Sequence, residues 1–299
     1  MKCLVIYSPF AKKGKINNYL TLIATVLQQK YEVSFAPTKY QNNAEYIASD
    51  ACGQYDIIIA AGGDGIISEV VNGIAQKPNK PKLGILSLGT VNDIAHCFKI
   101  PKNINKALDI ILTQKCRLID IFQVNDKYAV YELSAGQFTN STYETTQKSK
   151  RKLGRLAYFL KGFKNLFKIS KINLNITLDN LTNINTCFTF VLMLNCSSTA
   201  GFNINKNACL DDGYIDVLLF KNSNKSFGRH IKNLFDMALL FIFGLKSLKN
   251  SKNVIISKAK QIEIKNSQRL LFNKDGEIGP NSEMINISVL QQEIEIIVP

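Results

Sequence analysis

A glycine turn with a single carboxylate, Gly62-Gly63-Asp64-Gly65, is the part of the sequence best suited to chemistry. It joins a short apolar run, residues 56–61, to a segment whose apolar residues recur at helical spacing. Unpaired N–H groups at a helix start bind phosphate, and glycine lets the backbone approach the oxygens. Phosphate repels a carboxylate unless a cation or a hydroxyl group lies between them. The turn therefore predicts a phosphate site that works with Mg²⁺ or, alternatively, a tight turn capped by aspartate.

A second turn of the same kind, Gly89-Thr90-Val91-Asn92-Asp93, follows a strand-like segment, residues 82–86. Thr90 can offer a hydroxyl group to phosphate or metal, whereas Asn92 and Asp93 suit a helix cap or a ribose hydroxyl. In open α/β sheets, ligands bind at the carboxyl ends of the strands, so the two turns can converge on one ligand.

Two acidic turns lie in the second half of the chain. Asp211-Asp212-Gly213-Tyr214 is either a plain β-turn or an oxygen-rich cation site. Residues 273–277 place Asp275 and Glu277 on either side of a glycine, and this spacing favours a hairpin turn. The alternative is that one of these carboxylates is the base that takes a proton from an acceptor hydroxyl group.

The elements that must position these residues change in kind along the chain. Up to about residue 121, strand and helix patterns alternate, with one of the helices at residues 43–51, which predicts an α/β fold with a doubly wound parallel sheet. Short alternating strands follow, among them residues 128–133, 284–289 and 294–298, and predict a mainly antiparallel β-sandwich domain with added helices. We place the domains at residues 1–122 and 123–289, and residues 290–299 are free to return to the first domain.

Composition indicates a globular chain, with 46% hydrophobic and 20% charged residues among 299. The net charge of +14 favours a polyanionic partner: nucleic acid, an anionic membrane or a nucleotide. Cysteines lack CxxC spacing, so no zinc site is predicted. The longest apolar run, Met237 to Leu245, is too short to span a bilayer, and no signal peptide is visible, so we expect a soluble, cytoplasmic protein.

Two basic stretches, residues 145–171 and 221–260, each hold nine Lys or Arg around apolar residues at helical spacing. The first has no acidic residue and the second has only Asp236. Such stretches predict peripheral contact with an anionic membrane; the alternative for each is an ordinary helix with a solvated basic face. No nucleic-acid-binding motif is present, so nucleic acid is not expected as a partner.

Taken together, these motifs resemble the soluble diacylglycerol kinase family of bacteria, in its Gram-positive type, over nearly the whole chain. The resemblance rests on both glycine turns, on Thr38 followed by Ala44, on residues 134–147 and 154–163, and on both acidic turns. It implies an NAD kinase-like nucleotide domain, ATP as co-substrate, Mg²⁺ as cofactor and diacylglycerol as the lipid that is phosphorylated to phosphatidate.

The resemblance also implies roles for individual residues. The nucleotide contacts would be Ser8, Lys12, Thr38, Gly62, Gly63, Asp64, Gly65, Ile66, Ile67, Ser68, Glu69 and Thr90. A structural Mg²⁺ would bind the side chain of Asp212 and the carbonyl groups of Cys209 and Tyr214. Glu277 or Asp275 would be the general base, and Asp64 would hold catalytic Mg²⁺ or align the acceptor. Asp120 and Thr90 match positions that connect the two sites.

The sequence departs from the family pattern at Ile66, where threonine is usual, and at Ser68, where asparagine is usual. We expect an ATP- and Mg²⁺-dependent lipid kinase that acts at the membrane surface. The alternatives are an NAD kinase-like enzyme with a small-molecule substrate and a catalytically weakened regulator that binds lipid or nucleotide. A homodimer is left open.

Overall fold

The structure, a computed structural model, describes residues 1–9, 14, 16–136, 171–222 and 227–299. The chain forms two compact units. The first comprises Met1–Ile121 with Gln291–Pro299, and the second comprises Phe122–Leu290. Each unit is described separately.

The first unit is built on a parallel sheet in the order β2-β1-β3-β4. Its strands are β1 (Lys2–Tyr7), β2 (Glu32–Pro37), β3 (Ile57–Gly62) and β4 (Lys82–Ser87). Every residue of β3 is buried, which is why this strand is a continuous apolar run instead of an alternating pattern. The predicted doubly wound parallel sheet is confirmed. The order reverses between β1 and β3, and this switch point is where ligands bind in such sheets.

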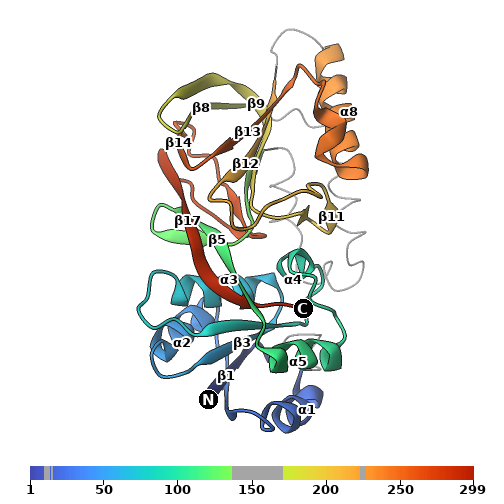
Figure 1. Ribbon diagram of the computed structural model, residues 1–299. Coiled ribbons are helices and arrows are strands. Elements are labelled where there is room, and N and C mark those ends of the chain that lie inside the picture. Colours follow the sequence, from blue (N-terminus) through green and yellow to red (C-terminus); the bar gives the residue numbers. More distant parts are fainter. Residues whose placement is uncertain (10–13, 15, 137–170, 223–226) are drawn as a thin grey trace. The chain divides into compact units, whose positions relative to one another are not determined.

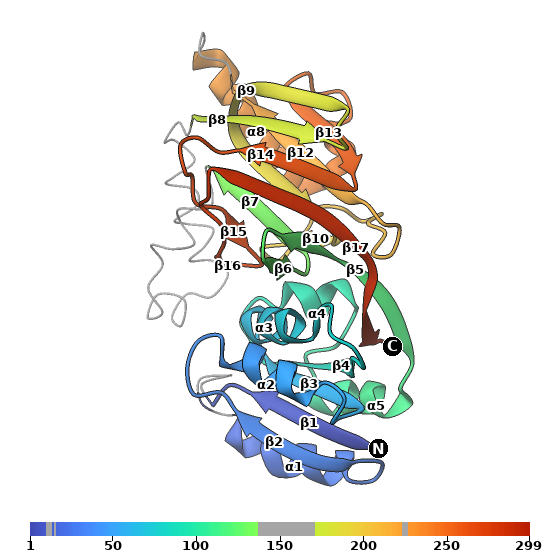
Figure 2. The same ribbon diagram turned by 90° about the vertical axis from the view of Figure 1, so that its left-hand side faces the viewer.

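Helices cover both faces of this sheet (Figure 1). They are α1 (Asn17–Leu27), α2 (Asn43–Ala51), α3 (Asp64–Ile74), α4 (Asp93–Cys97) and α5 (Ile104–Thr113). Helix α2 packs against α3, and α1 packs against α5 on the other face (Figure 2). Helix α5 is not among the predicted elements, although Asn103 caps it by accepting a hydrogen bond from the N–H of Lys106 at 3.2 Å.

Two strands run from one unit into the other: β5 (Cys116–Val124) and β17 (Met284–Ile297). The sequence predicted two separate strands where β17 is continuous. Between the two predicted strands, β17 bends at Gln292. This residue has a positive φ of 53° and donates its N–H to Oδ1 of Asp120 at 2.7 Å. The end of β17 pairs with β4 in the parallel sense, so the last residues return to the first unit.

The second unit is mainly antiparallel, as predicted. Its longer strands are β7 (Glu132–Gly136), β8 (Ile172–Leu178), β9 (Thr182–Leu194), β12 (Ile215–Lys221), β13 (Val254–Ala259) and β14 (Gln261–Lys265). Strand β9 is central: it pairs with β8 along its first half, with β7 along its second half, and with β12 on its other side.

Alternation along β9 and β12 builds two hydrophobic cores. Val191, Met193, Val217 and Leu219 belong to a core whose described residues come mainly from strands. Their neighbours on the opposite face, including Phe190 and Phe220, pack against helix α8 (Phe227–Phe243). The basic stretch 145–171 lies outside the described residues, except for Lys171, so its predicted amphipathic helix stays a prediction.

Candidate active site

The two glycine turns lie side by side in the first unit, at the carboxyl ends of β3 and β4. The N–H of Leu88 donates to the carbonyl oxygen of Gly62 at 2.7 Å. A Cβ atom added to Gly89 would lie 2.5 Å from Cα of Gly63, a distance that real Cβ atoms do not show. Glycine is therefore required where the two backbones touch.

Asp64 joins these turns through its side chain. Its two carboxylate oxygens accept hydrogen bonds from the N–H groups of Asp93 at 3.1 Å and Ile94 at 3.0 Å. Asp64 thus caps the start of α4 from the other turn. Its expected role toward Mg²⁺ or the acceptor stays a prediction.

Asn92 closes the second turn on itself. It lies in the left-handed region, with φ of 61°. Its side-chain oxygen accepts from the N–H of Gly89 at 2.8 Å, and its amide group donates to the carbonyl oxygen of the same residue at 2.9 Å. Thr90, within this closed turn, is exposed.

The other expected nucleotide contacts surround the same edge of the sheet. Ser8 follows β1, and the N–H of Thr38, just after β2, donates to the carbonyl oxygen of Tyr7 at 2.9 Å. Ser87, which was not predicted as a site residue, ends β4, and its buried hydroxyl group has no hydrogen-bond partner among the described residues. Lys12 lies outside the described residues.

Residues of α3 differ in accessibility. Gly65, Ile66 and Glu69 are partly exposed, whereas Ile67 and Ser68 are buried. Ile66 lies over the backbone of Gly62, where an added Cβ would be 2.8 Å from its Cγ1. Glu69 accepts a hydrogen bond from the N–H of Ala44 at 3.0 Å and so fixes α2 against α3.

In the second unit, residues 273–278 form a hairpin of β15 (Asn273–Lys274) and β16 (Glu277–Ile278). Asp275 and Gly276 form its turn with positive φ values of 51° and 83°, the combination that suits a two-residue hairpin. The hairpin reading of this spacing is confirmed. Asp275 is 1% exposed, whereas Glu277 is exposed.

The carboxylate of Asp275 anchors the hairpin. It accepts hydrogen bonds from three backbone N–H groups, those of Val130 at 2.8 Å, Tyr131 at 3.0 Å and Glu132 at 3.1 Å. These bonds also interrupt the single strand predicted for residues 128–133, which is divided into β6 (Lys127–Ala129) and β7. The two carboxylates that the sequence could not distinguish therefore differ. Asp275 is buried and hydrogen-bonded to the backbone, whereas Glu277 is exposed.

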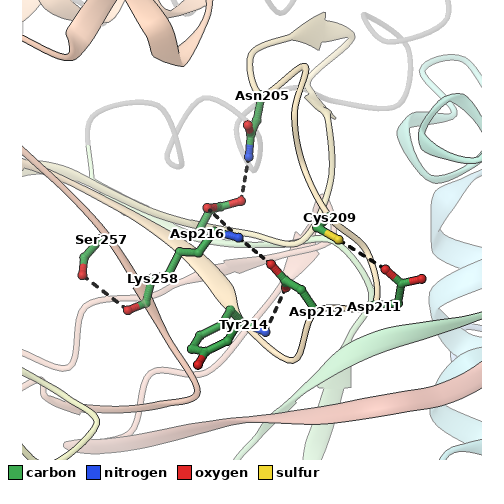
Figure 3. Close-up of polar contacts among 8 residues, drawn as sticks. All are labelled: Asn205, Cys209, Asp211, Asp212, Tyr214, Asp216, Ser257 and Lys258. Carbon is green, nitrogen blue, oxygen red and sulfur yellow. Dashed lines mark hydrogen bonds and ion pairs between the residues drawn. The ribbon is translucent and has the colours of Figure 1, made fainter.

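The acidic turn at residues 209–216 is organised around Lys258 (Figure 3). Nζ of Lys258 lies 2.5 Å from Oδ2 of Asp212 and 3.9 Å from Oδ1 of Asp216. Oδ1 of Asp212 accepts a hydrogen bond from the N–H of Tyr214 at 3.1 Å. The thiol group of Cys209 donates to Asp211 at 3.3 Å. Both oxygens of Asp212 therefore have N–H partners.

In this cluster, burial and the neighbouring charges act on each pKa in opposite directions. Burial raises the pKa of Asp216, while the charge of Lys258 and a hydrogen bond from Asn205 at 2.7 Å oppose this rise. Partial burial acts to lower the pKa of Lys258, but its hydrogen bond to Asp212 and the charge of Asp216 prevail and raise it. The raised pKa of Lys258 favours its ammonium form beside Asp212 and Asp216.

This arrangement does not fit a bound Mg²⁺ at Cys209, Asp212 and Tyr214, because the ammonium group of Lys258 occupies the carboxylate oxygen that a metal would take. In the described part of the chain, no cluster of three or more His, Cys, Asp or Glu side chains could hold a metal ion. The expected structural Mg²⁺ stays a prediction, and it requires Lys258 to release Asp212.

Replacing Lys258 tests that requirement. If a metal binds this turn, Lys258→Met should raise the affinity for Mn²⁺, used as a probe, about five- to tenfold, because the competing charge is lost. Electron paramagnetic resonance titration of free Mn²⁺ measures it. Lys260→Met is the matched control, since Nζ of Lys260 lies over the ring of Tyr214, 4.9 Å from its centroid. Unchanged affinity in Lys258→Met would rule out competition at this turn.

The fold of the chain, with its doubly wound first unit, is shared by solved structures of other proteins. An Archaeoglobus fulgidus NAD kinase in complex with ATP shares this fold, with a TM-score of 0.54 at 12% identity over 99% of this chain and 93% of that chain. A diacylglycerol kinase from Bacillus anthracis is closer in structure, with a TM-score of 0.77 at 24% identity over 100% of this chain and 97% of that chain.

Sequence comparisons identify the family. Residues 2–124 match the diacylglycerol kinase catalytic domain. A diacylglycerol kinase of Staphylococcus haemolyticus is 35% identical over 100% of this chain and 88% of its own length. Another, from Staphylococcus aureus strain MRSA252, is 36% identical over 99% of this chain and 91% of its own length. The chain belongs to the diacylglycerol kinase family and is a lipid kinase.

Proposed function

We propose that this kinase transfers the γ-phosphoryl group of ATP to the free hydroxyl group of diacylglycerol, giving phosphatidate at an anionic membrane surface. The full-length similarity to relatives named diacylglycerol kinase supports the acceptor. The observation that carries the reaction type is the contact between the two glycine turns at the carboxyl ends of β3 and β4.

ATP would lie along this edge of the sheet. The N–H groups at the N-terminus of α3, which begins at Asp64, would face the phosphates, and Gly63 and Gly65 would leave room for close approach. Ser8, Lys12, Thr38 and Thr90 would complete the nucleotide contacts around residues 62–69. Mg²⁺ bound with ATP would neutralise charge on the phosphates.

Glu277 would be the general base. Its carboxylate is exposed, whereas the oxygens of Asp275 are engaged by three backbone N–H groups, so Glu277 is the better placed to accept the proton of an alcohol. The hydroxyl oxygen of the acceptor would then bond to the γ-phosphorus as the bond between this phosphorus and ADP breaks. Asp275 would position Glu277 by fixing the hairpin, and Asp64 would hold the two nucleotide turns together.

The test is a lipid phosphorylation assay with purified protein, radiolabelled ATP and Mg²⁺. Mixed micelles of phosphatidylglycerol would contain diacylglycerol, ceramide or no acceptor, and NAD would be offered in a parallel reaction. We expect label in phosphatidate alone. Label in NADP without labelled lipid would favour the NAD kinase-like alternative; nucleotide binding without any transfer would favour the weakened regulator.

The contact between the turns makes a further prediction for ATP binding. A Cβ at position 89 would meet both Cα of Gly63 at 2.5 Å and Oδ1 of Asn92 at 2.6 Å. Gly89→Ala should therefore separate the turns, weaken ATP binding about tenfold or more and lower the free energy of unfolding by about 1–3 kcal/mol. Isothermal titration calorimetry and urea unfolding measure the two effects.

Gly63→Ala is the matched comparison, because its added Cβ would lie 3.2 Å from Cα of Gly89, a milder contact. We expect a smaller loss of affinity in this variant. An ATP affinity of Gly89→Ala equal to that of the wild type would contradict the steric account.

A further inference from the structure

Helix α8 carries large apolar side chains on its outward side. Phe235, Ile242 and Phe243 are 60%, 70% and 66% exposed, and we call these three residues the α8 outer face. Phe235 and Ile242 are seven residues apart in the sequence, so they lie on the same side of the helix. On the inward side, Met237 and Leu240 are buried against the core of β9 and β12.

Polar residues on the inward side fix this orientation. Asn233 is fully buried and donates from its amide group to the carbonyl oxygen of Lys221 at 2.7 Å. Asp236 is 5% exposed and accepts a hydrogen bond from the hydroxyl group of Ser251 at 2.6 Å. Rotating α8 to bury Phe235 and Ile242 would break these bonds, so the exposure of the outer face is built into the packing.

The charges beside this face have one sign. Lys232, Lys246 and Lys249 are exposed and lie close to it in sequence. Asp236 is the only acidic residue between Lys221 and Lys260, and it is buried on the inward side. The exposed groups of this segment therefore include aromatic and aliphatic side chains and lysines, and its one carboxylate is buried.

We propose that the α8 outer face docks on an anionic lipid bilayer. Phe235, Ile242 and Phe243 enter the boundary between headgroups and acyl chains, and the three lysines contact the anionic headgroups. No helix in the described ranges has the length and apolar character needed to cross a membrane. This inference rests on the proposed function in that the acceptor is a membrane lipid.

Charge decides between a bilayer and a second copy of the chain. A symmetric dimer through α8 would bring the same lysines from two copies together, because each copy presents the same patch. Like charges at close range oppose such a contact, whereas anionic headgroups complement them. The bilayer is therefore the occupant that fits both the apolar groups and the charges.

Vesicle sedimentation tests the proposal with the full-length protein. In the triple variant, Phe235, Ile242 and Phe243 are each replaced by serine. We expect it to bind vesicles of phosphatidylcholine with phosphatidylglycerol at least about tenfold more weakly than the wild type, since the apolar area is lost. Leu181→Ser is the matched control, because Leu181 is 88% exposed in the turn between β8 and β9. Wild-type binding by the triple variant would overturn the proposal.

Kinase assays separate this proposal from the proposed function. The triple variant should phosphorylate a dispersed short-chain diacylglycerol as fast as the wild type and vesicle-bound diacylglycerol at least about tenfold more slowly. If the wild type phosphorylates neither substrate, the proposed function fails, and sedimentation still decides the docking face. If light scattering shows that the wild type is a dimer and the triple variant a monomer with unchanged vesicle binding, the face is a protein interface and the proposal is wrong.

Discussion

Glu277→Gln should lower the turnover of diacylglycerol by about 10²- to 10⁴-fold, the range that general-base catalysis contributes. The amide group cannot take a proton from the acceptor hydroxyl group, although it keeps the size of the side chain. Glu277 is exposed on β16, so the substitution should leave the hairpin and the unfolding temperature unchanged. Initial rates in mixed micelles at saturating ATP measure the change in kcat.

Glu283→Gln is the control for removing one negative charge from the same part of the chain. Glu283 forms a surface ion pair with Arg269 at 2.9 Å, and its side chain is 65% exposed. We expect wild-type turnover in this control. A folded Glu277→Gln protein with wild-type kcat would exclude Glu277 as the base.

Asp275→Ala should lower the free energy of unfolding by about 3 kcal/mol, because three backbone N–H groups lose a charged acceptor in a buried place. The hairpin that carries Glu277 then loses its anchor, so kcat should fall as well. Urea unfolding and the lipid assay measure the two effects. Asp275→Asn should show an intermediate loss of stability, since it keeps an oxygen for Tyr131 and Glu132 but turns an amide group toward Val130.

Asp126→Ala is the matched control for Asp275→Ala, because Asp126 is exposed in the turn between β5 and β6. We expect its stability to be within about 0.5 kcal/mol of the wild type, as for most surface substitutions. Equal stability of Asp275→Ala and the wild type would show that the hairpin does not depend on this carboxylate.

The sequence predicted the first unit well because its signals are local. The run of residues 56–61, the glycine turn and the helical spacing after it identify β3 and α3 without any distant partner. Helix α2 has the predicted bounds, Asn43–Ala51. Helix α5, which was not predicted, carries local signals too: a capping asparagine at position 103 and apolar residues at Ile104, Leu108 and Ile111.

The second unit shows what local patterns cannot predict. Residues 128–133 have the composition of one strand, yet they are divided by the carboxylate of Asp275, which is 145 residues away from Val130 in the sequence. In the same way, Lys258 is 46 residues from Asp212 and reaches it only through the pairing of β12 with β13. Contacts at such separations come from the fold, and the backbone contacts of Asp275 are what distinguish it from Glu277.

The capping of α4 by Asp64 has a consequence for how the nucleotide turns respond to substitution. Helix α4 has only five residues, too few to be stable alone, and its first N–H groups depend on a side chain from the other turn. The two turns are therefore thermodynamically coupled. The effects of substitutions in the two turns should therefore be non-additive. Once a first substitution has disordered one turn, a second substitution in the other turn should cause only a small further loss of stability.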